Sequence, residues 1–213
     1  LAKGELVARM DADDAMHPLR LEKQVGFLQA NPELDGVTTG AYLIDAEDRP
    51  IALLPGRQPS AQEVLARGGF LHPSLLARKS WFEAHPYSLD YPRAEDRELF
   101  VRTFKTSRLH VLSEPLYFYR WFGVPRGKTL RIGYRSERKV MWKYGPNLVG
   151  WGPSLRLIAL SFGKELLTWF LEWTHLEKGF QTRRAFQPLL EMDQREALRT
   201  LKVIRETCVP GWD

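Results

Sequence analysis

The sequence predicts an α/β fold followed by a helical C-terminal extension. Short apolar runs typical of β-strands alternate with segments of helical periodicity through residues 1–122. The first strand candidate, residues 6–10, ends in a cluster of carboxylates at residues 11–14, which is where an open α/β sheet usually places its chemistry. Residues 123–213 lack such strand patterns and indicate a linker followed by helices. We therefore expect two parts, residues 1–122 and residues 123–213.

Local signals predict the first helix and the first hairpin. Apolar residues recur at helical spacing over residues 19–30, and Asn31-Pro32 ends this helix candidate. Residues 37–44 and 51–54 are strand candidates on either side of a polar turn, and this arrangement predicts a hairpin.

A capping box predicts the next helix. Ser60 and Glu63 have the required spacing for a helix over residues 61–67, which Gly68-Gly69 ends. The later elements of this part follow from composition and periodicity. We expect an extended segment, an irregular segment, a helix and two strands at residues 70–77, 81–92, 95–106, 109–112 and 115–120.

The extension is predicted to be helical and to follow a linker at residues 123–127. Its three helix candidates cover residues 129–144, 155–173 and 188–206. Glycine and proline predict a break at residues 145–153. The second helix is strongly apolar, but Lys164 and Glu165 near its centre argue against a membrane span. We expect it to pack on the rest of the protein or to lie at a membrane interface.

Charge is unevenly distributed between the two parts. Residues 1–120 have a net charge of −2, whereas residues 121–213 have a net charge of +7. Such a basic tail indicates an anionic partner, which is a membrane surface, an acidic glycan or nucleic acid, or else a solvated helical surface. The single cysteine, Cys208, excludes an internal disulfide framework and a cysteine-rich zinc site, and we expect no role for it.

The carboxylates at residues 11–14 form the first candidate site. Asp11, Asp13 and Asp14 repel one another unless a cation or several donors hold them. Mg²⁺ and Mn²⁺ prefer oxygen ligands, often one or two carboxylates together with phosphates. The segment therefore predicts a metal clamped against a diphosphate, with an acidic surface turn as the alternative.

Two further groups have both a functional and a structural interpretation. Glu95 and Asp96 open a predicted helix, where carboxylates favour the helix dipole. Alternatively, Asp96 is a general base that takes the proton of an attacking hydroxyl. His72 lies in an apolar stretch, where it is either a packed histidine or a metal or phosphate contact.

Four segments resemble, in order, those of the bacterial family 2 glycosyltransferases. They are the acidic segment with the helix after it, the segment around His72, the helix with Glu95 and Asp96, and an aromatic closing strand. In this sequence they cover residues 4–25, 70–78, 94–102 and 114–120. The tail beyond Arg120 matches no motif of the family.

The resemblance implies a fold of the GT-A type, a mixed sheet with flanking helices. It implies an inverting transfer from a nucleotide-diphosphate sugar to a hydroxyl of a cell-surface glycan or lipid-linked precursor, with Mg²⁺ or Mn²⁺ as cofactor. Asp11 would then lie near the donor ribose and diphosphate, Asp13 would ligate the metal together with Asp11, and Asp96 would be the base. Glu95 and His72 would support the acceptor side.

The resemblance also implies that Arg20 pairs with Asp14, one turn into the next helix. Two departures from the family pattern stand out. The β-α-β half that holds the nucleotide base does not precede Gly4, so we expect a protein that continues upstream. Without that half, the strand at residues 6–10 is predicted to lack partners. Residues 84–87 also differ from the turn that is usual in the family.

Three other functions remain open from the sequence. A non-catalytic nucleotide-sugar-binding module of the same fold would retain the acidic residues without turnover. An aspartyl-nucleophile phosphatase shares the Asp-x-Asp pattern, but it usually has Thr or Val where Ala15 stands. A nucleic-acid binder would explain the basic tail, but no recognition motif supports it. We expect a cytoplasmic protein with peripheral contact to the inner face of the plasma membrane through its basic C-terminal part.

Overall fold

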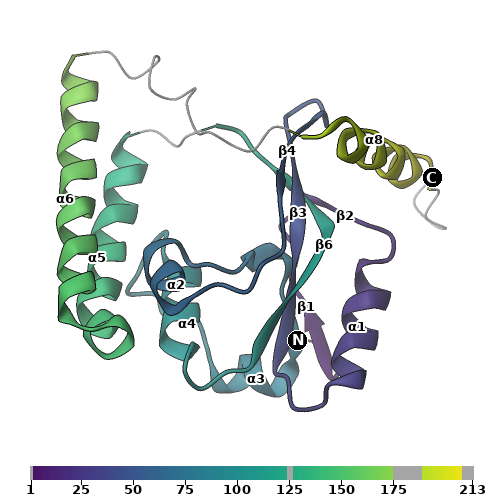
Figure 1. The fold of residues 1–213 in the computed structure, drawn as a ribbon, viewed down its shortest axis with the longest axis horizontal. Helices are drawn as coiled ribbons and strands as arrows, with labels where there is room; N and C mark the ends of the chain where they lie inside the picture. The colour runs from purple at the N-terminus through teal and green to yellow at the C-terminus, as the bar shows by residue number, and fades with distance from the viewer. Residues whose placement is uncertain (1, 124–126, 175–188, 208–213) are drawn as a thin grey trace.

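The computed structural model describes residues 2–123, 127–174 and 189–207 (Figure 1). Its strands are β1 (Leu6–Ala8), β2 (Ala15–Met16), β3 (Gly36–Ile44), β4 (Pro50–Leu54), β5 (Leu76–Arg78) and β6 (Leu109–Arg120). They form one mixed sheet in the order β1-β5-β3-β6-β2, and β4 pairs with β3.

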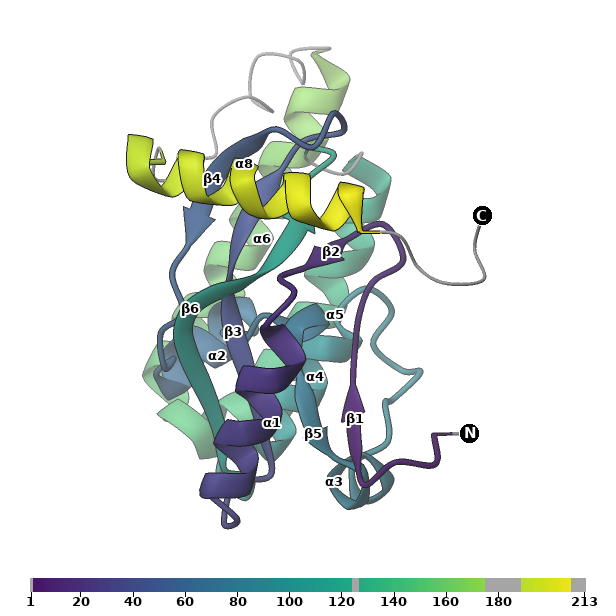
Figure 2. The ribbon, with the colours of Figure 1, turned by 90° about the vertical axis from the view of Figure 1, so that its right-hand side faces the viewer.

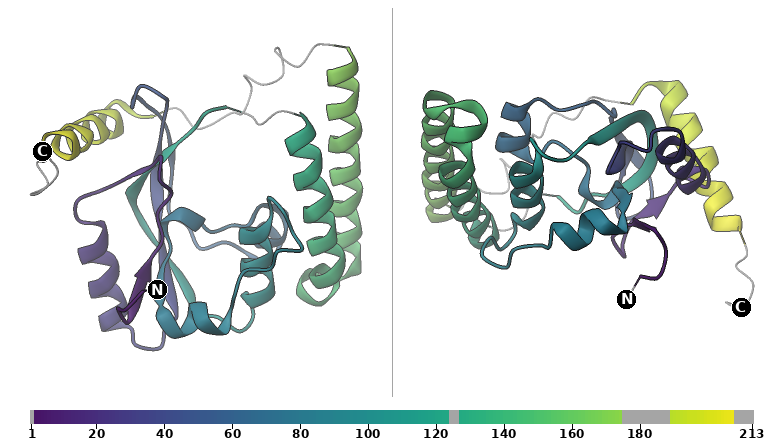
Figure 3. Two further views of the ribbon diagram at one scale, coloured as in Figure 1. Left: turned by 180° about the vertical axis from the view of Figure 1, so that it is seen from behind. Right: turned by 90° about the horizontal axis from the view of Figure 1, so that it is seen from below.

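Helices cover both faces of this sheet. They are α1 (Arg20–Ala30), α2 (Ala61–Arg67), α3 (Lys79–Ala84), α4 (Glu95–Thr103), α5 (Gly127–Val149), α6 (Trp151–Trp173) and α8 (Glu191–Glu206). Helices α1 and α8 lie on one side of the sheet, whereas α2 and α4 lie on the other (Figures 1 and 2). The α5–α6 hairpin forms an outer layer beyond α2 and α4 (Figure 3). The predicted α/β fold with flanking helices and C-terminal helices is confirmed.

Strand β3 is the centre of the sheet. All nine of its residues are buried, and it runs parallel to β6 and antiparallel to β4 and β5. Its pairing with β4 confirms the predicted hairpin. The predicted capping box of α2 is also present, since the Ser60 hydroxyl accepts from Glu63 N–H and the Glu63 carboxylate accepts from Ser60 N–H.

Two strands were predicted where the structure has the single strand β6. Thr39 pairs with Leu112, but the next residue, Gly40, pairs with Pro115. Extra residues therefore bulge out of β6 at this point without ending the strand. The strand pairs with β3 both before and after the bulge. In the sequence, the proline at this point indicated the end of one strand and the start of another.

Strand β1 has a partner, so the prediction that it lacks one is wrong. It pairs antiparallel with β5, with Val7 opposite Ala77, and it forms the end of the sheet. The segment predicted to be extended, residues 70–77, enters β5 only after a 3₁₀ turn at His72–Ser74. Proline near the start of such a turn fixes the backbone angle that the turn requires.

Part of the segment predicted to be irregular is the helix α3. Trp81 is buried on this helix, and its indole N–H donates to the Ser107 hydroxyl at 2.7 Å. The helix ends at Ala84, just before His85-Pro86. The many aromatic and proline residues of this segment gave no helical pattern in the sequence, because the helix is stabilised by tertiary packing.

A break is present within residues 145–153, as predicted, but it is narrower than expected because α5 continues past Pro146 to Val149. The turn into α6 is a single residue, Gly150, with φ of 88°. Gly145 lets the two helices approach closely, since a Cβ there would lie 2.5 Å from the Ser154 hydroxyl oxygen. Most of the predicted linker lies outside the described residues.

The extension packs on the α/β part at two places. Val140 and Met141 of α5 share an apolar cluster with Leu65 and Leu99. Ala197 and Leu201 of α8 pack against the β3 and β6 residues Tyr42, Ile44 and Phe118. Residue 188 and Cys208 lie outside the described residues. In the part of the chain that the structure describes, no helix combines the length and apolarity needed to cross a bilayer.

Candidate functional site

The acidic segment of residues 11–14 follows β1 directly. Asp11 forms an ion pair with Arg9, with 2.9 Å between Oδ1 and Nη1. The backbone N–H of Asp11 donates to the Tyr117 hydroxyl at 3.2 Å. Asp13 is exposed, and within the described ranges no hydrogen bond or ion pair engages its carboxylate. Both carboxylates predicted on the metal side therefore lie beyond the end of β1, one held by the protein and one open to solvent.

Asp14 does not pair with Arg20, and that prediction is wrong. Its Oδ1 accepts from the backbone N–H of Arg120 at 2.7 Å, from a residue 106 positions away in the sequence. Burial raises the pKa of Asp14, while this N–H and the Tyr117 hydroxyl lower it. The third carboxylate of the cluster thus anchors the segment to β6.

Arg20 is a fully buried cation on α1, with 0% of its surface exposed. Its Nε donates to Gln24 Oε1 and its Nη2 to the Arg9 carbonyl, both at 2.9 Å. The guanidinium carbon lies 5.0 Å from the centre of the Tyr117 ring. Burial lowers the pKa of Arg20 to about 10, which leaves it charged at neutral pH. Arg20 therefore holds the backbone at the end of β1 and makes no ion pair with the carboxylates of the acidic segment among the described residues.

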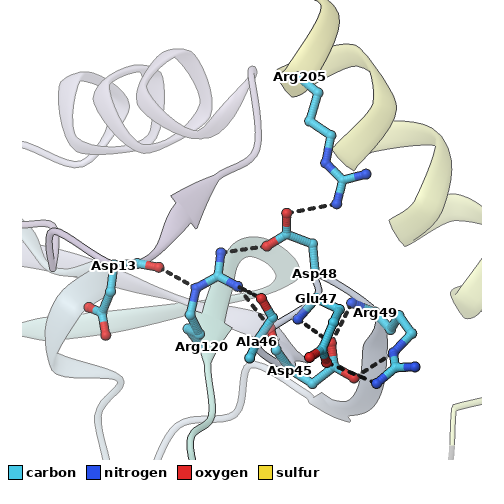
Figure 4. Close-up of polar contacts among 8 residues, drawn as sticks. All are labelled: Asp13, Asp45, Ala46, Glu47, Asp48, Arg49, Arg120 and Arg205. Atoms are coloured by element: carbon cyan, nitrogen blue, oxygen red, sulfur yellow. Dashed lines mark hydrogen bonds and ion pairs between the residues drawn. The ribbon is translucent and has the colours of Figure 1, made fainter.

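Arg120, at the end of β6, also holds the acidic segment (Figure 4). Its Nε donates to the Asp13 carbonyl at 2.7 Å, and its Nη1 donates to the Asp45 carbonyl at 2.8 Å. Its Nη2 pairs with the Asp48 carboxylate. One planar guanidinium thereby ties the acidic segment to the β3–β4 turn, a geometry that an ammonium could not reproduce. Sequence reasoning did not single out Arg120, because its partners are distant in the sequence.

Asp48 connects this turn to the C-terminal helix. Its Oδ2 accepts from Arg205 Nη2 on α8 at 2.7 Å (Figure 4). The hydrogen bond from Arg205 lowers the pKa of Asp48 most; burial opposes it, and the hydrogen bond from Arg120 lowers the pKa further. Asp48 adopts a φ of 60°, a left-handed conformation that aspartate tolerates better than most residues. The predicted extension thus contacts the turn that supports the acidic segment.

His72 lies in the 3₁₀ turn before β5, close enough to Asp11 and Glu95 for their charges to act on its pKa. Its Nε2 is 2.8 Å from the Tyr87 hydroxyl, and its ring packs edge-on against Phe100 at 5.7 Å between centroids. Burial, followed by the positive charge of Arg9, lowers the pKa of His72 to about 4. The imidazole is therefore neutral at physiological pH, and Tyr87 comes from the segment that departs from the family pattern.

Glu95 and Asp96 form the first turn of α4. Asp96 is half-buried, and its Oδ1 accepts from the backbone N–H of Arg97 at 2.7 Å. Glu95 is exposed. The N-cap residue is Ala94, which makes no side-chain capping hydrogen bond. Neither carboxylate occupies the N-cap position itself, although both are placed favourably for the helix dipole.

The two carboxylate groups both lie close to Tyr119, a half-buried residue of β6. Burial raises the pKa of Tyr119, and the negative charges of Asp14, Asp11, Asp13 and Asp96 raise it further. Such effects require short separations. The structure thus brings the acidic segment and the start of α4, about 80 residues apart in the sequence, into one site.

The donor set bears on whether a divalent cation fits. In the described residues, no three His, Cys, Asp or Glu side chains are grouped as a metal site. Mg²⁺ is usually held by one or two carboxylates together with substrate phosphates and water. Asp13 and Asp11 therefore fit a cation that is shared with a bound diphosphate, and they do not fit a cation held by the protein alone.

Comparison with known proteins gives a consistent set of sequence relatives. EpsE of Bacillus subtilis (strain 168), whose name assigns it provisionally to the glycosyltransferases, is 33% identical over 125 residues, which are 56% of this chain and 44% of EpsE. WbnJ of Escherichia coli, named as an O-antigen biosynthesis glycosyltransferase, is 32% identical over 123 residues, covering 55% of this chain and 48% of WbnJ. MJ1057 of Methanocaldococcus jannaschii, by name an uncharacterized glycosyltransferase, is 24% identical over 125 residues, covering 56% and 43%.

Crystal structures of S. aureus TarS 1–349 are similar to this fold at 15% sequence identity. The structure in complex with UDP covers 76% of this chain and 47% of that chain with a TM-score of 0.48, and a second covers 93% and 56% with a TM-score of 0.49. No protein-family model matches the chain. The chain spans under half the length of the sequence relatives. Over 56% of its own residues, this chain is thus related in sequence to proteins named as glycosyltransferases.

Proposed function

We propose that the protein containing this chain transfers a sugar from a nucleotide-diphosphate sugar to an acceptor hydroxyl of a cell-surface glycan or lipid-linked precursor. One observation supports this most strongly. Two groups of carboxylates, distant in the sequence, lie close enough to Tyr119 for their charges to raise its pKa, one after β1 and one at the start of α4. The names of the sequence relatives support the same class of reaction.

In this proposal, Asp13 and Asp11 bind the donor diphosphate through Mg²⁺ or Mn²⁺. The cation, when bound, neutralises the charge that develops on the departing diphosphate. Asp13 is suited to this role because its carboxylate is exposed. Arg120 and Arg20 position the segment by bonding the carbonyls of Asp13 and Arg9. Misplacement of such a segment by even 1 Å can cost on the order of a hundredfold in rate.

Asp96 is the proposed general base. Its Oδ1 is occupied by the Arg97 N–H, so Oδ2 is the oxygen that takes the proton of the acceptor hydroxyl. The hydroxyl oxygen forms a bond to the anomeric carbon as the bond from that carbon to the diphosphate breaks. This single displacement inverts the anomeric centre. Glu95 and His72 border the acceptor side, and the neutral His72 can accept or donate a hydrogen bond there.

We propose that the reaction takes place on the cytoplasmic side of the plasma membrane. A lipid-linked acceptor would be presented at the inner membrane face. The +7 charge of residues 121–213 favours peripheral contact with an anionic bilayer there.

Turnover by the full-length protein tests the reaction. Donor hydrolysis and transfer would be measured with Mn²⁺ and a panel of UDP-, GDP- and dTDP-sugars. We expect metal-dependent turnover that falls by at least about a hundredfold in Asp13→Ala and in Asp96→Asn, since general-base and metal contributions are of that size. Glu22→Gln, an exposed carboxylate on α1, is the control and should retain full activity.

Donor binding separates this proposal from the alternative of a non-catalytic module. Titration calorimetry with the nucleotide-diphosphate sugars would accompany the turnover assay. Metal-dependent binding without turnover under any acceptor would favour the binding module. Absence of both would leave residues 11–14 as an acidic surface turn.

A further inference from the structure

Helix α6 exposes an apolar stripe on the outer side of the molecule. Its residues recur every three, four or seven positions, so they share one side of the helix. Each is between 48% and 75% exposed: Trp151, Leu155, Phe162, Leu166, Trp169 and Trp173. Figure 1 shows α6 as the outermost element, with α5 between it and the rest of the protein. Trp142 of α5, 60% exposed, extends the stripe by packing edge-on against Trp151.

The side of α6 that faces the protein carries polar side chains beside the apolar Leu157 and Ile158. Ser154 and Ser161 are buried against α5. Glu165 pairs with Arg138 of α5, and Glu172 pairs with Arg131. A surface helix normally buries its apolar stripe and exposes its charges. On α6 the residues of the outer stripe lie away from this buried side and are exposed, so the stripe is not a core face of the described structure.

Basic side chains border this apolar stripe. The α5–α6 hairpin, residues 127–173, contains eight Lys or Arg and three Glu residues, which gives a net charge of +5. The Arg138 guanidinium lies 4.0 Å from the centre of the Phe162 ring, and that of Arg131 lies 5.8 Å from the Trp169 ring. Tryptophan and phenylalanine next to arginine are the residues that suit the boundary between lipid headgroups and acyl chains.

The charge decides between the two occupants that could cover such a stripe. A second copy of the chain would bring one +5 hairpin against another, and the like charges would repel. An anionic bilayer would attract the same charges, at roughly 1 kcal/mol for each Lys or Arg near its surface. Since no described helix can span a bilayer, the hairpin would lie along the surface.

We propose that the α5–α6 hairpin docks on an anionic phospholipid surface with the α6 stripe inserted at the level of the headgroups. This assigns the membrane contact to one helix face, and it does not depend on the transfer reaction. The α/β part is then held on the other side of α5, away from the bilayer.

Vesicle flotation of the full-length protein tests the docking surface. The vesicles are phosphatidylcholine alone and phosphatidylcholine mixed with phosphatidylglycerol, and brominated lipids report tryptophan insertion by quenching fluorescence. We expect binding to the anionic vesicles at least about tenfold tighter than to the neutral ones, weakened by salt. Leu166→Glu, at a position 70% exposed, should weaken binding by at least about tenfold, because burial of a leucine contributes roughly 1.5–3 kcal/mol.

Met192→Glu on α8 is the matched control, since Met192 is 79% exposed and lies outside the hairpin. It should bind vesicles as the wild type does. The proposal would be overturned by no binding to either vesicle, by equal binding to both, or by equal binding of Leu166→Glu and the wild type. If Leu166→Glu leaves vesicle binding unchanged but dissociates a dimer, the stripe is covered by a second copy instead.

Discussion

Individual residues of the site are held by long-range bonds from two arginines. Arg20 is buried and bonds the Arg9 carbonyl, and Arg120 bonds the Asp13 carbonyl. Hydrogen bonds to charged donors contribute roughly 1.5–3 kcal/mol each, about twice as much as neutral ones. The acidic segment therefore needs no regular secondary structure to hold its conformation. Asp13 stays exposed because its backbone, not its carboxylate, is the group that the protein binds.

His72 should make the fold sensitive to mild acid. Its pKa is about 4 in the folded protein and about 6.5 in an unfolded chain. Between these values the unfolded state binds more protons than the folded state, so the free energy of unfolding should fall as pH drops from about 6.5 toward 4. Above that window His72 is neutral in both states and has no such effect.

Urea unfolding of the wild type and of His72→Gln, at about pH 7.5 and about pH 5, measures this effect. The wild type should lose more stability between the two pH values than the variant, because only the wild type carries the shifted imidazole. Parallel losses would show that His72 titrates normally in the folded protein.

At the scale of elements, α2 is defined by its own ends. Ser60 and Glu63 bond each other's backbone N–H groups at its start, and Gly68 adopts a φ of 85° at its end. The hydrogen bond from Arg57, followed by those from Ser60, lowers the pKa of Glu63 to about 2. Helix α5 is the opposite case, because it continues through Pro146 on the strength of its packing.

Ser60→Ala should lower the free energy of unfolding by about 1 kcal/mol, the usual cost of removing an N-cap hydroxyl. Ser80→Ala is the control, since Ser80 is an exposed serine of α3; it should change stability by less than about 0.5 kcal/mol. Chemical denaturation of the three proteins gives both values. Equal effects of the two substitutions would mean that the capping box does not stabilise α2.

At the scale of the whole molecule, apolar packing and an ion pair between described residues attach α8 to the α/β part. Leu201, 4% exposed, packs against Tyr42, Ile44 and Phe118. Arg205 pairs with Asp48, but the arginine side chain is 58% exposed. Exposed ion pairs usually contribute less than about 1 kcal/mol, whereas a buried leucine contributes several times more. We infer that apolar packing, rather than the ion pair, holds the helix in place.

Leu201→Ala should therefore destabilise the protein by about 2–5 kcal/mol, and Arg205→Ala by less than about 1 kcal/mol. Denaturant unfolding of both variants checks the order. A larger loss in Arg205→Ala would place the attachment of α8 in the ion pair with Asp48.

The sequence by itself determined the features that depend on neighbours in the chain. The strand before the acidic segment, the β3–β4 hairpin and the α2 capping box all follow from spacing and local hydrogen bonding. The resemblance to glycosyltransferases also depends on local segments, and the sequence relatives agree with it. The roles of Asp11, Asp13 and Asp96 remain predictions that the turnover assay tests.

Only the tertiary structure decided the features that join distant segments. Asp14 and Arg120 are 106 positions apart, and the expected pair of Asp14 with Arg20 is absent because the buried Arg20 guanidinium bonds Gln24 and the Arg9 carbonyl instead. The β6 bulge and the outward apolar face of α6 likewise depend on which surface each element meets. The spacing of apolar residues indicates whether a segment is a helix or a strand. It does not indicate which other elements the segment packs against, because that depends on contacts made across the fold.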